Sequence, residues 1–126
     1  MKKEYTVWKL FGGYLLILLF MIISSSLNAQ SYDECGEDIC VVEFNASWNA
    51  GNNVTWLNDL SDVGAKRILI DKGDWQKKFG IVVTPTIIIF VSGKESKRYQ
   101  ANIMMQIEAK QTEVQDKIDE IIMEDF

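Results

Sequence analysis

Histidine is absent from this chain of 126 residues, which has only one proline and two cysteines. Without histidine the chain lacks the commonest general base, the usual activator of a serine or cysteine nucleophile, and the commonest metal ligand. The acidic residues show no run with the spacing of a calcium-binding loop. We therefore expect neither a hydrolase triad nor a bound metal, and we predict no cofactor.

Positive charge is scarce beyond residue 29. The whole chain has 13 Lys and Arg against 18 Asp and Glu, and residues 30–126 have 10 against 17, a net charge of −7. Nucleic acids and anionic membrane surfaces are bound through cationic patches that neutralise phosphate groups. The charge balance therefore argues against both of them as partners.

The first 29 residues have the three parts of a secretory signal peptide. Lysines precede an apolar run over residues 10–23, and three serines and Leu27-Asn28-Ala29 follow it, with Ala29 as the small residue after which cleavage would precede Gln30. The run of about fourteen residues is short for the ~20 that a membrane-spanning helix needs, which favours cleavage over an uncleaved anchor. We expect export to a periplasm or to the extracellular space, with membrane association only if the segment is retained.

The cysteines, Cys35 and Cys40, lie in and directly after an acidic segment, residues 30–39, that has no periodicity and is predicted to be a tether. In an oxidising compartment the two residues are candidate disulfide partners. So short a bridge would stabilise the fold by on the order of 2 kcal/mol. Three interpretations stay open at this point: a structural disulfide, a redox centre of another kind, or two unpaired thiols.

Residues 40–126 read as one domain in which strand and helix patterns alternate, and this alternation favours parallel pairing of strands. Trp56 and Trp75 are predicted to be core residues. A capping box at Thr112 and Gln115 predicts the start of the last helix. The expected strands cover residues 39–44, 67–71, 87–91 and 97–100, and the expected helices cover residues 49–60, a short segment capped by Asp74, and the residues behind Thr112.

Three segments, taken in order, resemble the thioredoxin family. Residues 41–48, Val-Val-Glu-Phe-Asn-Ala-Ser-Trp, look like that family's central strand and the approach to its active-site helix. Residues 80–90 contain Thr-Pro-Thr and look like the loop with the family's cis-proline and the strand behind it, and residues 92–94 match the next turn. The resemblance implies an α/β, thioredoxin-like fold with a central mixed sheet of about four strands flanked by helices, without the family's first strand and helix.

Where the thioredoxin family has cysteine, two residues and cysteine, this chain has Asn49-Ala50-Gly51-Asn52. An asparagine amide neither ionises to a nucleophile nor bonds to sulfur, so ordinary thioredoxin exchange is excluded at these two positions. The family's buried acid would be Glu43. For Glu43 we expect a paired or hydrogen-bonded structural role.

The resemblance also implies a peptide groove between Trp48 and the loop of Thr84 and Pro85, with Pro85 in the cis form. Trp48 is either an exposed aromatic of this groove or an ordinary packing residue. Cys35 and Cys40 are expected at the opposite end of the sheet, because Cys40 begins the central strand and Trp48 follows its end.

The favoured hypothesis is a redox-inactive module, not an enzyme, that binds a protein or an extended peptide in this groove. The backbone before Pro85 would pair with the ligand as an added strand. One alternative is a thiol–disulfide oxidoreductase or electron relay that uses Cys35 and Cys40. Another is a structural accessory domain whose groove has no ligand, since a fold does not determine a function.

Overall fold

The computed structural model describes residues 30–125, and the predicted signal segment, residues 1–29, lies outside them. No helix within residues 30–125 has the length and apolar character needed to cross a membrane. The chain forms β-strands, α-helices and 3-10 helices, the last labelled η. In chain order the elements are β1 (Ile39–Asn45), η1 (Ser47–Asn52), η2 (Leu57–Asp59), β2 (Gly64–Leu69), α2 (Trp75–Phe79), β3 (Thr86–Val91), β4 (Lys94–Gln100) and α3 (Gln111–Asp125).

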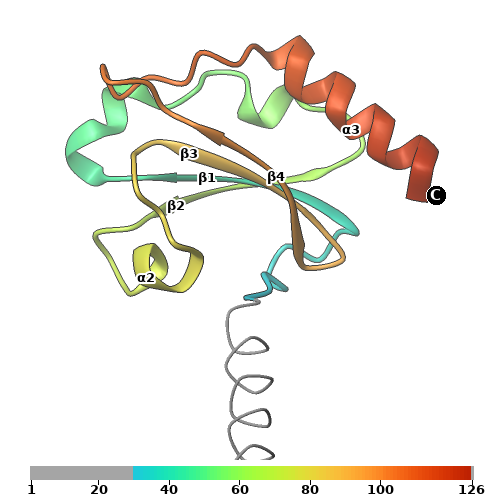
Figure 1. The fold of residues 1–126 in the computed structure, drawn as a ribbon, viewed down its shortest axis with the longest axis horizontal. Coiled ribbons are helices and arrows are strands. Elements are labelled where there is room, and N and C mark those ends of the chain that lie inside the picture. Colours follow the sequence, from blue (N-terminus) through green and yellow to red (C-terminus); the bar gives the residue numbers. More distant parts are fainter. Residues whose placement is uncertain (1–29, 126) are drawn as a thin grey trace, which may run out of the picture. The chain divides into compact units, whose positions relative to one another are not determined.

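The four strands form one mixed sheet in the order β2-β1-β3-β4, with β1 in a central position (Figure 1). β1 pairs in parallel with β2 and antiparallel with β3, and β3 pairs antiparallel with β4. Within the described part of the chain no strand or helix precedes β1. The predicted α/β fold, a four-stranded mixed sheet flanked by helices, is confirmed.

Two apolar clusters cover the two faces of this sheet, because successive side chains of a strand point to opposite faces. α3 lies along one face, with Val114, Ile118 and Ile121 packed on alternate residues of β1 and β3, whereas Phe79 at the end of α2 packs on the other face (Figure 1). Trp56 and Trp75, both predicted to be core residues, are partly buried against the first and the second cluster respectively.

The helix predicted over residues 49–60 is wrong. Two short 3-10 helices, η1 and η2, take its place, and the chain between them leaves helical geometry at Asn53, where φ is −57° and ψ is 138°. Asparagine, glycine and threonine are weak helix formers, and asparagine side chains compete with the helix for hydrogen bonds. Here the side chain of Asn53 accepts a hydrogen bond from Asn45 Nδ2 at 2.6 Å, so a side-chain contact replaces a helical turn.

Further boundaries differ from prediction, and β4 begins at Lys94, three residues before the strand expected over residues 97–100. The second strand is β2, residues 64–69, which begins three residues earlier than predicted because its pairing with β1 extends back to Gly64. The capping box is also wrong, since α3 begins at Gln111 and the side chain of Gln115 bonds elsewhere. Gln115 Oε1 accepts from Ser61 N at 2.8 Å and Gln115 Nε2 donates to Ser61 O at 3.3 Å, which ties α3 to the loop before β2.

Part of the acidic segment predicted as a tether packs on the domain. Tyr32 is only 4% exposed within the second apolar cluster, and its N–H donates to Gly93 O at 2.8 Å. Cys35 and Cys40 form a disulfide, and residues 30–125 contain no free cysteine. The interpretation of two unpaired thiols is therefore wrong, and the chain is fixed in place ahead of β1.

Candidate functional site

The candidate site lies at the end of the sheet where the chain leaves β1. Phe44, near the end of β1, pairs with Thr86, the first residue of β3, so the loop before β3 lies beside residues 45–49. The Thr84–Pro85 peptide bond in this loop is cis, as the resemblance implied. The structure thus brings together the two segments that were predicted to form a groove.

A cluster of buried amides holds this corner of the domain together. Asn45 is fully buried, and its Nδ2 donates to Asn49 O at 3.0 Å and to Asn53 Oδ1 at 2.6 Å. Asn45 Oδ1 accepts from Ala46 N at 2.9 Å and from Asn49 Nδ2 at 3.0 Å. Every hydrogen-bonding atom of the Asn45 side chain is therefore used within the corner.

Asn49, the first of the two asparagines at the predicted redox positions, points into this cluster. It is 7% exposed, and its Nδ2 lies 3.4 Å from both Thr84 O and Met105 O. Asn52, the second, donates from Nδ2 to Asn49 Oδ1 at 2.8 Å. The amides thus link η1 to the Pro85 loop and to the loop after β4, and the Asn49 amide lies in the interior, not on the groove surface.

Beside this corner the surface is hollowed into a groove of about 500 Å³. Its rim carries large apolar side chains that are left in solvent: Trp48 is 69% exposed, Val82 79% and Ile103 99%. Trp48 is therefore an exposed aromatic and not a packing residue. The full lining is Ala46, Trp48, Ile70, Asp71, Gln76, Val82, Val83, Thr84, Asn102, Ile103 and Met105.

Asp71 fixes the loop that carries Trp48. Its two carboxylate oxygens accept from Ser47 N at 3.0 Å and from Ser47 Oγ at 2.7 Å. These two hydrogen bonds hold the pKa of the Asp71 carboxyl below its usual value, and the bond from the Ser47 side chain has the larger effect. Asp71 therefore bears a negative charge at the edge of the groove at neutral pH.

Comparison with solved structures identifies this architecture. A thioredoxin variant from Halobacterium salinarum NRC-1 superposes with a TM-score of 0.54 at 18% identity, over 68% of this chain and 76% of that one. The chain has a thioredoxin fold. A thioredoxin-2 of the malaria parasite gives a TM-score of 0.52 at 18% identity, over 65% and 82% of the two chains, and a designed protein gives 0.52 at 16%, over 68% and 82%. No family model and no curated protein sequence matches the chain.

In this thioredoxin-fold domain the buried acid, Glu43, is fully paired. Its Oε1 accepts from Arg67 Nε at 2.5 Å on the neighbouring strand, and its Oε2 accepts from Val54 N at 2.9 Å. Arg67 also donates from its second guanidinium nitrogen to Val54 O at 2.8 Å. Both carboxylate oxygens are engaged in structural contacts, which agrees with the hydrogen-bonded role expected for Glu43.

The disulfide lies at the other end of β1. Cys40 pairs with Phe90, at the far end of β3 from Thr86, and five residues of strand, about 16 Å, separate Cys40 from Asn45. Cys40 is 2% exposed, whereas Cys35 is partly exposed in a hollow of about 240 Å³ that is also lined by Asp33, Glu37 and Asp38.

This disulfide bears on the predicted function. The expectation of a redox-inactive module is not supported for the domain as a whole, because the fold contains a cystine, a group capable of thiol–disulfide exchange. The observation favours the alternative that uses Cys35 and Cys40 over the redox-inactive reading. The position of the cystine also separates the sulfur chemistry of the domain from its groove.

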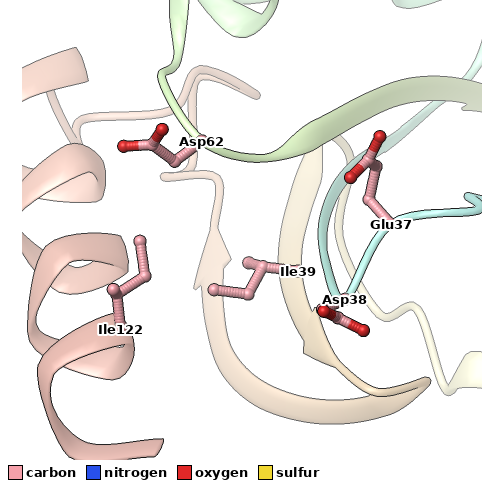
Figure 2. A pocket seen from close by; sticks show the side chains of 5 residues that line it. All are labelled: Glu37, Asp38, Ile39, Asp62 and Ile122. Carbon is pink, nitrogen blue, oxygen red and sulfur yellow. The ribbon is translucent and has the colours of Figure 1, made fainter. Parts of the chain in front are cut away.

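A smaller hollow of about 160 Å³ lies between the start of β1 and the end of α3 (Figure 2). It is lined by Glu37, Asp38 and Asp62 together with two isoleucines, Ile39 and Ile122. Figure 2 shows that Glu37 and Asp38 lie on the segment before β1, that Asp62 comes from another segment, and that the three carboxylates do not converge on one point. Within residues 30–125 no group of three acidic or sulfur ligands could hold a metal ion.

Several residues of the groove were not predicted from the sequence. Asp71 was treated as the end of a strand, and Val82 as part of an apolar run. Ile103 and Met105 belong to an apolar segment after β4 that forms no regular element within the described chain. A signal was present in that segment, since apolar side chains in a loop that cannot be assigned to a strand or helix indicate a surface contact.

Proposed function

We propose that the domain binds an extended polypeptide in the groove between Trp48 and the Thr84–Pro85 loop. The observation that carries this proposal is the convergence of Trp48, Val82 and Ile103, which come from η1 and two separate loops and leave large apolar side chains in solvent around one hollow. Contiguous exposed apolar surface of this kind marks interaction sites on soluble domains. The groove volume lies in the range of known ligand sites.

The backbone beside the groove supports an extended ligand. Within residues 30–125 the N–H groups of Val83 and Thr84 donate to no acceptor. An incoming chain that runs alongside them would supply carbonyl acceptors, in the manner of a strand added to an exposed edge. The apolar rim would then contact the side chains of the ligand.

Asn49 and Asn52 belong to the same proposal. They stand where the resemblance to thioredoxins places the redox cysteines, and their amides make hydrogen bonds within the domain. Because an amide cannot form a mixed disulfide, the ligand is held in the groove without a covalent bond. The amides fix the loops that form the groove, and the exposed side chains make the contacts.

Thiol–disulfide exchange at Cys35 and Cys40 is a second candidate function, favoured by the disulfide itself. A thiolate of an external dithiol would attack Sγ of Cys35, the more exposed of the two residues, and release Cys40 as a thiolate that takes up a proton. The second thiol of the reductant would then attack its own sulfur in the mixed disulfide and release Cys35 as a thiolate, which takes up a proton. The balance is one dithiol oxidised to a disulfide and one cystine reduced to two thiols.

The groove proposal is tested by fluorescence anisotropy with short, labelled, unstructured peptides of apolar sequence. Replacing Trp48 by alanine removes the largest exposed contact, and we expect the affinity to fall at least about tenfold. Met123→Ala is the matched control, because Met123 is 86% exposed but does not line the groove. Equal binding by wild type and Trp48→Ala would refute the proposal.

The second candidate is tested on the same proteins by reduction of insulin in the presence of a dithiol. Activity of the wild type that disappears in the Cys35→Ser, Cys40→Ser double variant would establish exchange at the cystine. Peptide binding measured in parallel on the double variant shows whether the two functions are separate. If the groove proposal holds, this affinity is unchanged.

A further inference from the structure

Asp71 is distinct among the residues that line the groove. Within the described part of the chain it is the only lining residue that ionises, whereas the others are apolar or carry neutral polar groups. A bound polypeptide would thus meet one negative charge amid an apolar surface. An isolated charge of this kind selects for the opposite charge in a ligand more than it adds to overall affinity.

The Asp71 carboxylate is available to a ligand although Ser47 already binds it. Each oxygen accepts one hydrogen bond from Ser47 and retains a further acceptor position. Asp71 is exposed, and no ion pair within residues 30–125 occupies it. The charge of Lys72, its neighbour in sequence, helps to lower the pKa of Asp71, but the Lys72 ammonium forms no ion pair with the Asp71 carboxylate.

We propose that the polypeptide accepted by this groove carries a lysine or arginine whose side chain reaches Asp71, with apolar residues beside it that contact Trp48 and Ile103. The inference rests on the proposed function and specifies its ligand class. The overall charge agrees with it, because residues 30–126 carry a net charge of −7 and attract a basic partner at long range. A second copy of this chain fits poorly as the occupant, since it carries the same net charge.

The experiment uses three labelled peptides with one apolar, unstructured sequence that differ only at a central position: lysine, glutamine or glutamate. On the wild type we expect the lysine peptide to bind about two- to fivefold more tightly than the glutamine peptide, as for an exposed ion pair, and the glutamate peptide to bind most weakly. The lysine preference should shrink at high salt, because screening weakens the pair.

Asp71→Asn separates charge from shape. The amide can still accept from Ser47 N and donate to Ser47 Oγ, so the loop is kept while the charge is lost. We expect the lysine preference to disappear, so that the lysine and glutamine peptides bind Asp71→Asn with equal affinity. Asp74→Asn is the matched control, because it removes the same charge from an exposed residue of the next turn that does not line the groove, and it should leave the preference intact.

The outcomes distinguish this inference from the proposal beneath it. A lysine preference that persists in Asp71→Asn, or that is absent from the wild type, overturns the inference, while binding that still depends on Trp48 leaves the groove proposal standing. If none of the three peptides binds the wild type, or if Trp48→Ala binds each peptide as tightly as the wild type does, the groove proposal fails and the inference fails with it.

Discussion

At the end of β1 that leads into residues 46–53, buried amides join η1 to two loops, whereas at the opposite end a covalent bond joins Cys35 to Cys40. The amide end carries an open groove with exposed apolar residues, and the cystine end carries a shallow acidic hollow. In this domain the group capable of redox chemistry and the surface suited to binding therefore lie apart. Each end can be disrupted without removing the other.

The largest effect is expected from Asn45→Ala, which breaks the amide end at its centre. The substitution removes four hydrogen bonds and leaves Ala46 N, Asn49 O and Asn53 Oδ1 without the partner that Asn45 supplies. Unpaired buried polar groups are costly, so we expect a loss of about 3 kcal/mol in the free energy of unfolding.

Urea denaturation measures this loss, and peptide binding should weaken with it because the groove loops lose their support. Asn58→Ala is the matched control: Asn58 is exposed, its side chain makes no hydrogen bond within residues 30–125, and its loss should change stability by less than about 0.5 kcal/mol. Equal effects of the two variants would show that the amide cluster is not a stabilising unit.

The cystine end should respond less. The Cys35→Ser, Cys40→Ser double variant loses the constraint on a short loop, and the loop-entropy model gives a loss of about 2 kcal/mol. Denaturation of the wild type with and without a reductant provides an independent measure of the same quantity. We expect peptide affinity to stay within twofold of the wild type, about 0.4 kcal/mol. A large fall in affinity would mean that the two ends are coupled through β1.

The sequence predicted this division between the two ends better than it predicted the local structure. Buried runs such as residues 39–44 and 87–91 identify their strands directly, because an apolar run covered on both faces has few other solutions. The corner was harder to predict. Residues 49–60 have helical spacing of apolar residues, but Asn45 and Asn53 form side-chain hydrogen bonds that no periodicity reveals.

The residues of the groove were also only partly predictable from the sequence. Trp48 and Pro85 could be placed there by resemblance, whereas Asp71, Val82 and Ile103 meet only after three separate loops have folded together. Their proximity depends on contacts between residues far apart in sequence, such as that between Ser47 and Asp71. A single sequence does not encode such contacts in any local pattern.

A smaller effect at the groove end should appear in acid. The pKa of Asp71 in the folded state is lowered by its hydrogen bonds to Ser47. Its stabilising contribution is therefore fully present above the unfolded value, 3.8, and is lost as the pH falls through the lowered pKa. We expect the difference in stability between wild type and Asp71→Asn to be greatest near neutral pH and to shrink in acid, as measured by urea denaturation at several pH values.

Asp74→Asn is the control for the acid measurement, because the Asp74 side chain accepts no hydrogen bond within residues 30–125. Its difference from the wild type should vary less over the same acidic range. If both variants gave the same pH profile, the contact between Asp71 and Ser47 would carry no stabilisation of its own.

The smallest effect is expected at the cystine end in alkali, where Tyr32 anchors the segment that Cys35 closes. Burial, and then the charge of Glu34, raise the pKa of Tyr32 above its usual 10.0. The unfolded chain therefore loses this proton first, so stability that is present below pH 10.0 is lost as the pH rises through the raised pKa. Tyr32→Phe should lessen the alkaline loss seen in urea denaturation.

Tyr99 is the comparison, because burial raises its pKa too but it packs on the opposite face of the sheet. If the disulfide holds Tyr32 in place, the stability difference between Tyr32→Phe and its parent in alkali should shrink when the parent is the Cys35→Ser, Cys40→Ser double variant. The corresponding difference for Tyr99→Phe should not shrink. Equal shrinkage of both differences would show that the disulfide stabilises the whole domain and not only the cystine end.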